Sequence, residues 1–450
     1  MASTNVNTKD VQGQNAGSCT IESVIITSKT DSSRTVNVAG GFVELRYYES
    51  ILQDGIRGAY MFADTGNSIG KKTVSEGLPL NGGETLSFSA KDNNGTQLKF
   101  DMIVGKDTSV VQDTTKSLVT LPLASKAFAI NDTKCVRKFF PNQKISDHVK
   151  TLMTDFLDTD KTLDIEETSN SLKEYGLSRK PYYMLNTFAK KAQPSGGEGN
   201  TAGYFFFETS EKMIFKSIDS FFDENKNPKK RSIIYNQGPE KNQVPAGYDY
   251  KALTYNRESA DKLEMSKGGA FTTRSVSVDP SPKNGGFNFT HNILSTIEDI
   301  AETVDDAIEP LTTAAKELVT FPSDLIREFS RTTMSFLDTG AYGETANESL
   351  ENNFDFGAIY NQSIMRYNQV FASKVHILIQ GDFDLHAGDM IFFDAPSPEE
   401  DTKNDEIDKQ AGGLYIIASL CHQITSDRTL TKLMLIRDSF GRKGNHTRRP

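Results

Sequence analysis

Candidate chemistry in this 450-residue sequence is concentrated near its C-terminus. Asp382, Asp384 and His386 alternate along the chain, and His376 lies on the preceding predicted strand. Carboxylate and imidazole groups that project from one face of a strand can form a metal-binding set. The intervening residues are apolar and supply a buried face, so a polar outer face at a strand end explains the same spacing. We favour this structural interpretation and predict no metal site.

A second candidate is the pair Cys421-His422, because a thiolate near an imidazole can act as a nucleophile. Adjacent residues on a strand point to opposite faces, however, and Cys421 lies in an apolar run where we expect it to pack in the core. The sequence shows no H-E-x-x-H or P-loop motif, no G-x-S-x-G nucleophile elbow and no G-x-G-x-x-G that opens a helix after a strand. We therefore predict no catalytic residue, no cofactor-binding site and no cofactor. The 60 acidic residues leave a glycosidase-like carboxylate pair as an open alternative.

The elements that would position these groups begin with a strand-rich N-terminal region. The stretch 20–27 alternates apolar and polar residues, and 42–48 is rich in β-branched and aromatic residues. Turn residues bracket the stretch 85–90, and 98–104 follows directly, which is the spacing of an antiparallel hairpin. Short strands without intervening helices are typical of a sandwich or barrel.

The pattern changes to helical spacing within residues 131–222. Apolar residues from Ile145 to Phe156 recur at helical intervals after Pro141, and a second helix is predicted over 182–189. The stretches 204–208 and 212–215 indicate a hairpin. We interpret this region as a small α+β domain.

Strand patterns return in the C-terminal half, at 232–235 and 272–279, and dominate the last hundred residues. The strands predicted there are 374–379, 390–393, 413–418, 421–424 and 430–437. They are joined by polar turns and by a charged loop at 396–411.

One stretch before these strands predicts an acidic amphipathic helix. The apolar residues on its predicted face are Ile293, Ile297, Ile300, Val304, Ile308 and Leu311. The acidic residues on the remaining surface are Glu298, Asp299, Glu302, Asp305, Asp306 and Glu309. Three interpretations stay open: a partner-binding helix, a helix packed on a neighbouring subunit, and a solvated helix on its own domain.

Composition excludes several classes of protein. The chain has 50 Lys and Arg against 60 Asp and Glu, and the resulting net charge of −10 disfavours a surface that binds nucleic acid throughout. Its 36 % hydrophobic content argues against global disorder, and its apolar runs are too short to cross a bilayer. The residues Cys19, Cys135 and Cys421 are widely spaced, so we expect no disulfide framework. The first residues show no signal-peptide pattern.

Two stretches carry a resemblance to a known family. The first runs from His376 to Phe393, with the turn Gly381-Asp382-Phe383-Asp384-Leu385 before a strand, and continues through the predicted strands up to Leu435. The second is Lys138-Phe139-Phe140-Pro141-Asn142, which we expect to open a helix. Weaker similarities lie at 53–62 and 203–215. In order and spacing these stretches resemble the central baseplate hub protein of contractile-tailed bacteriophages, a member of the tail-tube-like hub family.

The resemblance implies a mainly β fold with α+β parts, built from two tail-tube-like antiparallel β-barrels, a small α+β domain and a helical insertion. The expected division is a flexible N-terminal arm at 1–18, a first barrel at 19–130, the α+β domain at 131–222, a second barrel at 223–286 and 346–440, a helical insertion at 287–345 and a basic C-terminal tail at 441–450. The insertion looks longer and more acidic than the family pattern.

What the resemblance implies for function is a structural virion protein of the baseplate and not an enzyme. The expected assembly is a homotrimer that joins a hexameric tail tube, or its initiator protein, to a trimeric cell-puncturing spike. Its channel would carry the tape-measure protein and then DNA in transit, without stable membrane association. Assembly would take place in the reducing cytoplasm of the host bacterium, as the cysteine usage suggests. The alternatives are the hub of a related contractile injection system and a peptidoglycan hydrolase used in penetration.

Overall fold

The structure is a computed structural model. It describes residues 17–66, 72–78, 80–106, 109–112, 116–195, 202–235, 244–245, 247–259, 261–279, 288–295, 331–336, 357–395 and 412–438. The flexible arm expected before Gly17, the charged loop at 396–411 and the basic tail lie outside these residues. Ordered pairing begins slightly earlier than predicted, because Gly17 forms an isolated bridge with Thr429.

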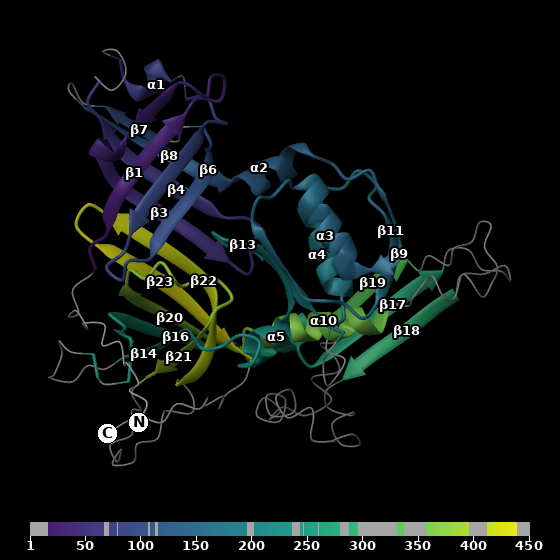
Figure 1. Cartoon of the computed structure of the whole chain (residues 1–450). Coiled ribbons are helices and arrows are strands. Elements are labelled where there is room, and N and C mark those ends of the chain that lie inside the picture. The colour runs from purple at the N-terminus through teal and green to yellow at the C-terminus, as the bar shows by residue number, and fades with distance from the viewer. Residues whose placement is uncertain are drawn as a thin grey trace, which may run out of the picture.

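The first barrel-like unit comes from the N-terminal region, as the strand pattern predicts (Figure 1). Its strands are β1 (Thr20–Thr27), β2 (Thr35–Asn37), β3 (Phe42–Ser50), β4 (Arg57–Asp64), β5 (Thr85–Lys91), β6 (Gln97–Val104), β7 (Ser109–Gln112) and β8 (Ser117–Ser125). They pair antiparallel in the order β2-β1-β5-β6-β8-β4-β3, with β7 also on β8. Two short helices accompany them, the 3-10 helix η1 (Ala39–Gly41) and α1 (Val74–Gly77). Inward side chains such as Val24, Leu86 and Tyr60 form its core.

The second barrel-like unit combines strands that are far apart in the sequence. They are β14 (Arg231–Ile234), β15 (Tyr250–Lys251), β16 (Thr254–Ser259), β20 (Ser373–Gln380), β21 (Met390–Asp394), β22 (Gly413–Thr425) and β23 (Thr429–Arg437). The amide of Leu253 donates to the Leu378 carbonyl at 2.7 Å, and the amide of Ala252 donates to the Ile234 carbonyl at 2.8 Å. The residues after β15 thereby connect β14 with β20. This unit encloses a second core that includes Val375, Phe393 and Leu435.

The mainly β prediction is confirmed, but the expectation of purely antiparallel pairing is wrong for one strand. β14 runs parallel to both β15 and β21. The chain enters β14 from the α+β domain and returns to the adjacent β21 only much later, so strand direction is set by where the chain enters the barrel and not by a hairpin turn.

One long strand joins the two units into a single 15-stranded sheet. The sequence suggests two strands at 413–418 and 421–424, but β22 is continuous and bends at a register shift between Ile417 and Ser419. Its first half pairs with β21, and its second half pairs with β3 from Ser419↔Ser50 to Thr425↔Glu44. A bulge bends a strand without ending it, and here it lets one strand serve both barrels.

The α+β region has its own core between two small sheets. Its elements are α2 (Lys126–Thr133), β9 (Phe139–Lys144), α3 (Ile145–Thr151), the π-helix η2 (Leu152–Phe156), β10 (Thr162–Ile165), β11 (Ser171–Tyr175), α4 (Pro181–Lys191), β12 (Tyr204–Glu208), β13 (Lys212–Ser217) and α5 (Ile218–Phe222). The sheets are β10-β13-β12 and β11-β9. The predicted hairpin is confirmed as β12–β13. The motif from Lys138 to Asn142 does not itself open a helix, because Phe139 begins strand β9 and the helix starts at Ile145.

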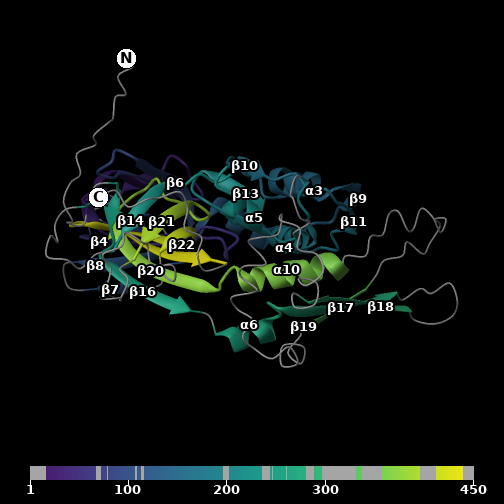
Figure 2. The same cartoon turned by 90° about the horizontal axis from the view of Figure 1, so that it is seen from below.

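A third small sheet, which we call the third sheet, lies beside α10 (Gly357–Gln369), and this helix separates it from α4 (Figure 2). Its strands are β17 (Thr272–Asp279), β18 (Asn288–Ser295) and β19 (Arg331–Phe336), preceded by α6 (Lys262–Gly268). The helical insertion predicted over 287–345 is therefore wrong for two segments, Asn288–Ser295 and Arg331–Phe336. Both pair with β17, and this long-range pairing outweighs the local helical pattern that includes Ile293. Residues 296–330, with most of the predicted acidic helix, lie outside the described part of the chain.

Helix α10 was not predicted from the sequence, because much of its buried face is polar. Asn361, Ser363, Arg366 and Gln369 are all buried. Arg366 donates from Nε to Asp219 of α5 at 2.8 Å and contacts Asp438, just after β23, at 2.8 Å. One guanidinium thus ties α10 to two other parts of the fold. No helix within the described ranges has both the length and the apolar character needed to cross a membrane.

Replacing Arg366 by Ala should lower the free energy of unfolding by about 3 to 5 kcal/mol, because it leaves the buried Asp438 carboxylate, and the partly exposed Asp219, without the guanidinium that pairs with them. Urea denaturation followed by circular dichroism measures this change. Lys126→Ala is the matched control, since Lys126 also faces two carboxylates, Asp158 and Asp160, but is 52 % exposed where Arg366 is 4 % exposed. The control should change stability by less than about 1 kcal/mol. Equal losses in the two variants would contradict the anchoring role of Arg366.

Candidate functional site

The loop 381–389, between β20 and β21, connects three separate cores, and we call it the clamp loop. Phe383 packs in the core of the first barrel, although the strands on either side of the loop belong to the second barrel. Leu385 lies in the core of the second barrel. Ala387 packs in a third cluster, where the outer face of the second barrel meets Phe207 and Phe221 of the α+β domain. Alternate residues of one short loop therefore anchor all three units.

Two glycines allow the clamp loop to approach its neighbours closely. A Cβ on Gly381 would lie 2.3 Å from Cγ2 of Thr429. Gly388 has φ +89, and a Cβ there would lie 2.9 Å from the ring of Phe207 and 3.0 Å from Phe221. The amide of Gly388 also donates to the Ile417 carbonyl at 2.8 Å, beside the bulge of β22. Only a residue without a side chain fits at these positions.

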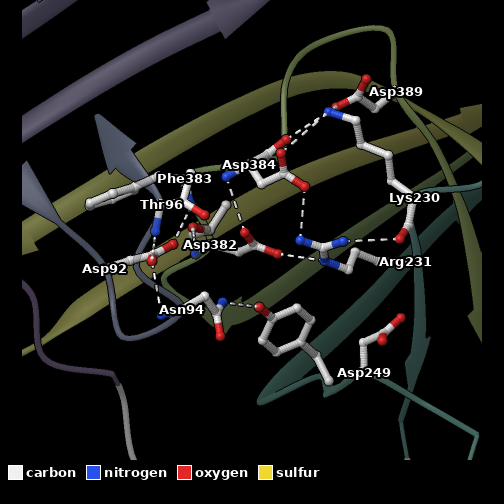
Figure 3. Close-up of polar contacts among 12 residues, drawn as sticks. Asp92, Asn94, Thr96, Lys230, Arg231, Asp249, Asp382, Phe383, Asp384 and Asp389 are labelled. Atoms are coloured by element: carbon white, nitrogen blue, oxygen red, sulfur yellow. Dashed lines mark hydrogen bonds and ion pairs between the residues drawn. The ribbon is translucent and has the colours of Figure 1, made fainter. Parts of the chain in front are cut away.

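Arg231 of β14 holds the acidic residues of the clamp loop (Figure 3). Its Nε donates to Asp382 Oδ2 at 2.8 Å and its Nη2 donates to Asp384 Oδ2 at 2.9 Å. The neighbouring Lys230 donates to the Asp384 carbonyl and forms an ion pair with Asp389 at 3.0 Å. From the first barrel, Asp92 accepts a hydrogen bond from the amide of Phe383 at 3.0 Å. These polar contacts fix the loop between the two barrels.

Glu49 of β3 is the buried charged group at the centre of the junction. Its carboxylate accepts hydrogen bonds from the Tyr47 hydroxyl and from the amide of Ser210, each at 2.8 Å. It also accepts from the amide of Ala387 at 3.1 Å, and Nδ1 of His386 lies 3.3 Å from both of its oxygens. One carboxylate thus joins the first barrel, the β12–β13 turn and the clamp loop.

Burial and mutual attraction act in opposite directions on the charges of Glu49 and His386. Burial alone would raise the pKa of Glu49, but the positive charge of His386 and hydrogen bonds from His386, Tyr47 and Ser210 lower it to about 2. Burial alone would lower the pKa of His386, but Glu49 raises it above its ordinary value. The pair is therefore most stable when both groups are charged.

The four residues considered as candidate metal ligands lie in different environments in the structure. Asp382 and Asp384 bind Arg231, His386 binds Glu49, and His376 lies on the outer face of β20 with its Nε2 3.7 Å from Glu258. Within the described ranges, no group of three or more His, Cys, Asp or Glu residues could hold a metal ion. The expectation of a polar outer strand face is wrong, because residues 381–389 are not a strand and Asp382 is fully buried.

Cys421 and His422 point to opposite faces, as predicted, but their environments are the reverse of the expectation. His422 is the buried residue: its ring stacks on Tyr47 at 6.0 Å, its Nδ1 lies 2.9 Å from the Thr431 hydroxyl, and burial lowers its pKa to about 4. Cys421 is only partly buried on the outer face, opposite Tyr48, and burial raises the pKa of its thiol. A protonated thiol on the far side of the strand from a neutral imidazole is not an activated nucleophile.

A shallow groove of about 870 Å³ crosses the outer face where the barrels meet. Strands β3, β16, β20, β22 and β23 contribute its lining, which includes Tyr48, Leu52, His376, Cys421 and Lys432. This lining mixes apolar, basic, acidic and neutral polar side chains, and Glu49 is among them.

Glu49 and Arg231 were not identified from the sequence, although one signal for Glu49 is present. Leu45, Tyr47 and Glu49 lie on one face of β3, and all three are buried. A carboxylate on the apolar face of a predicted strand must have a buried partner. Arg231 offers no such signal, because its partners are distant in the sequence.

Two barrel-like units in one sheet, joined by a loop that packs in three hydrophobic clusters, define a mainly β fold whose conspicuous polar site is internal. The same fold occurs in phage tail proteins. The tail protein from Neisseria meningitidis MC58 matches with a TM-score of 0.53 and 9 % identity, over 94 % of this chain and 98 % of that chain. The 43 kDa tail protein of prophage MuSo2 from Shewanella oneidensis matches with a TM-score of 0.52 and 9 % identity, over 92 % of this chain and 98 % of that chain. The sequence matches no protein-family model and no curated protein.

Gly388→Ala should lower the free energy of unfolding by about 2 to 4 kcal/mol, because the new methyl group combines a disfavoured φ with contacts to two aromatic rings. The measurement is urea denaturation. Gly40→Ala is the control, since nothing lies within 4 Å of a Cβ at that position, and its effect should be within about 0.5 kcal/mol. A Gly388 variant as stable as the control would refute the close fit of the clamp loop.

Stability should also depend on pH through His386. A raised pKa means that the stabilisation is fully present below a pH of about 6.5 and is lost as pH rises through the pKa of the folded state. Asp389, whose pKa burial raises, and Lys230 also face this imidazole. Replacing His386 by Gln should therefore destabilise the protein more at a pH of about 5.5 than at about 9.

Urea denaturation of the wild type and the His386→Gln variant at both pH values gives this difference. His376→Gln is the control, because His376 pairs with Glu258 at an exposed position and should contribute little at either pH. A penalty for His386→Gln that is the same at both pH values would show that the charge of His386 does not stabilise the junction.

Proposed function

We propose that this protein is the central hub of a contractile phage tail baseplate. The observation that carries the proposal is the single sheet shared by two barrel-like units through β22 and β3. The likeness in fold to two tail proteins, one of them from a prophage, over more than 90 % of each chain supports it.

The proposed assembly follows from the number of barrels in one chain. Three chains would supply six barrels, so a homotrimeric ring would have pseudo-sixfold symmetry toward a hexameric tail tube and threefold symmetry toward a trimeric spike. Such an adaptor needs a fixed angle between its two barrels. The clamp loop and the Glu49–His386 pair supply rigid connections of the kind this role requires.

The proposed partners are the trimeric spike protein, the tail tube or its initiator, and the end of the tape-measure protein. DNA would pass through the central channel without being held. The hub would be assembled in the host cytoplasm and would remain in the virion baseplate. The division into arm, barrels and α+β domain given above is part of this proposal, except that β17, β18 and β19 form a separate sheet.

The purified chain, alone or mixed with candidate spike and tube proteins, should form a ring with three times the mass of the 49.8 kDa chain. Light scattering coupled to gel filtration measures the mass, and electron microscopy of the same peak shows whether six similar densities surround a channel. A strict monomer that binds neither spike nor tube would overturn the proposal.

A zymogram on bacterial peptidoglycan distinguishes the hub from a cell-wall hydrolase. We expect no clearing, because the candidate nucleophile and metal ligands of the C-terminal region are separated or already paired. Lysozyme on the same gel is the positive control. Clearing by the purified chain would contradict a purely structural role.

A further inference from the structure

The outer end of the α+β domain carries an exposed apolar surface that the barrels do not use. Phe139, Tyr175, Leu177 and Tyr183 are 41 %, 56 %, 73 % and 55 % exposed. Phe139 and Tyr175 are paired residues of β9 and β11 with ring centroids 4.7 Å apart, and the Arg179 guanidinium lies 5.1 Å from the ring centroid of Tyr183. We call these four residues the aromatic patch. Exposed apolar side chains in one cluster are typical of a contact surface.

The backbone at the centre of the patch is strained and firmly held. Leu177 has φ 45 and Ser178 has φ 60, a conformation that non-glycine residues rarely adopt. Hydrogen bonds from Gly176 to Lys138, from Ser178 to Val136 and from Val136 to Arg179, each 2.8 to 2.9 Å, fix the turn. The strain therefore presents the most exposed side chain of the patch, Leu177, rigidly to solvent. Strain of this kind persists where the surroundings over-determine it and often marks a functional position.

The rim of the aromatic patch is basic although the chain as a whole is acidic. Segments 134–138 and 173–180 contain one acidic residue, Glu174, which already pairs with Lys191 at 2.6 Å and Arg179 at 3.8 Å. From outside these segments, Asp155 pairs with Lys138 at 3.3 Å. The basic residues of these segments are Lys134, Arg137, Lys138, Lys173, Arg179 and Lys180. The chemistry that fits an apolar centre with this rim is an acidic amphipathic segment.

This chain contains such a segment in its sequence. Between Asn292 and Ala315 there is no Lys or Arg, and the apolar residues from Ile297 to Leu311 recur at helical spacing among six acidic residues. The segment leaves the third sheet after Ser295, and the chain rejoins that sheet at Arg331. Figure 2 places this sheet on the other side of α10 from the β9–β11 sheet. The strand that precedes the segment in the sequence, β18, is therefore separated by α10 from the sheet that carries the patch.

We propose that the aromatic patch of one copy binds the acidic segment 297–311 of the next copy. Two different, complementary surfaces on the same chain make a heterologous contact, which closes into a ring when the rotation between copies allows it. The inference rests on the proposed ring and names an interface that would hold its members together. Aromatic anchors at the centre and charges at the rim give the contact its specificity.

Leu177→Gly tests the apolar centre of the patch without endangering the fold, because Gly adopts the φ of this position without strain. Self-association measured by sedimentation should weaken at least about tenfold. Val111→Ser, at a 64 % exposed position on β7, is the control and should leave association unchanged. A Leu177 variant that associates like the wild type would overturn the inference.

Charge reversal tests the pairing between the two surfaces. Arg137→Glu with Lys138→Glu on the rim, or Glu302→Lys with Asp305→Lys on the segment, should each weaken self-association at least about tenfold. All four substitutions in one chain should restore it, because the signs are complementary again. Failure of the combined variant to recover association, while circular dichroism shows it to be folded, would contradict the pairing.

Cys135 provides a position-specific probe, because it is exposed beside the patch, whereas Cys19 and Cys421 are partly buried. A photo-crosslinker on Cys135 should join two chains, and proteolysis with mass spectrometry should find the second site within 297–311. A crosslink to this segment within one chain would show that it binds its own patch and would overturn the proposed contact. The wild type could instead bind a dT oligonucleotide that the Leu177 variant does not bind, with no crosslink to the segment. This result would also overturn the proposed contact and would assign the patch to nucleic acid.

These results separate the inference from the proposed function. A wild-type trimer that is unaffected by the patch variants keeps the hub proposal and rejects only this interface. A wild-type chain that stays monomeric and gives no crosslink between chains rejects both.

Discussion

The architecture depends on keeping a charged carboxylate, Glu49, buried where three units meet. A buried charge is tolerated only when partners replace water, and here they come from the clamp loop, the β12–β13 turn and β3 itself. The same loop inserts Phe383 and Leu385 into the cores of different barrels. If any one unit moved, the carboxylate would lose a hydrogen bond and a core would lose a side chain. The polar and apolar contacts therefore favour one relative placement of the barrels.

The same contacts account for the most conspicuous polar cluster of the described residues. Asp382, Asp384 and His386 have the residue types of a metal site, but Arg231 and Glu49 engage them through charge-assisted hydrogen bonds. In the structure these contacts hold the clamp loop against β14 and β3. For a proposed symmetry adaptor, a fixed angle between barrels is the functional property, since three chains can present six similar units only if each pair is held in the same way.

The sequence predicted many individual elements because their patterns are local. The strand Thr20–Thr27, the hairpin β12–β13 and the helix around Leu185 follow the periodicity of their apolar residues. Helix α10 was missed because its buried face includes Ser363 and Arg366, whose partners lie elsewhere in the fold. The strands β18 and β19 were missed because they depend on pairing with β17. Pattern reasoning fails where a distant partner supplies the stabilisation.

By itself, therefore, the sequence determined the mainly β class, the absence of an H-E-x-x-H or P-loop motif and the opposite orientation of Cys421 and His422. Each follows from residue identity or from the two-residue period of a strand. Only the tertiary structure decided that β22 serves both barrels, that β14 runs parallel to its neighbours and that the clamp loop enters three cores. These features join residues hundreds of positions apart. Their energies arise from burial and pairing across that distance, which no local pattern records.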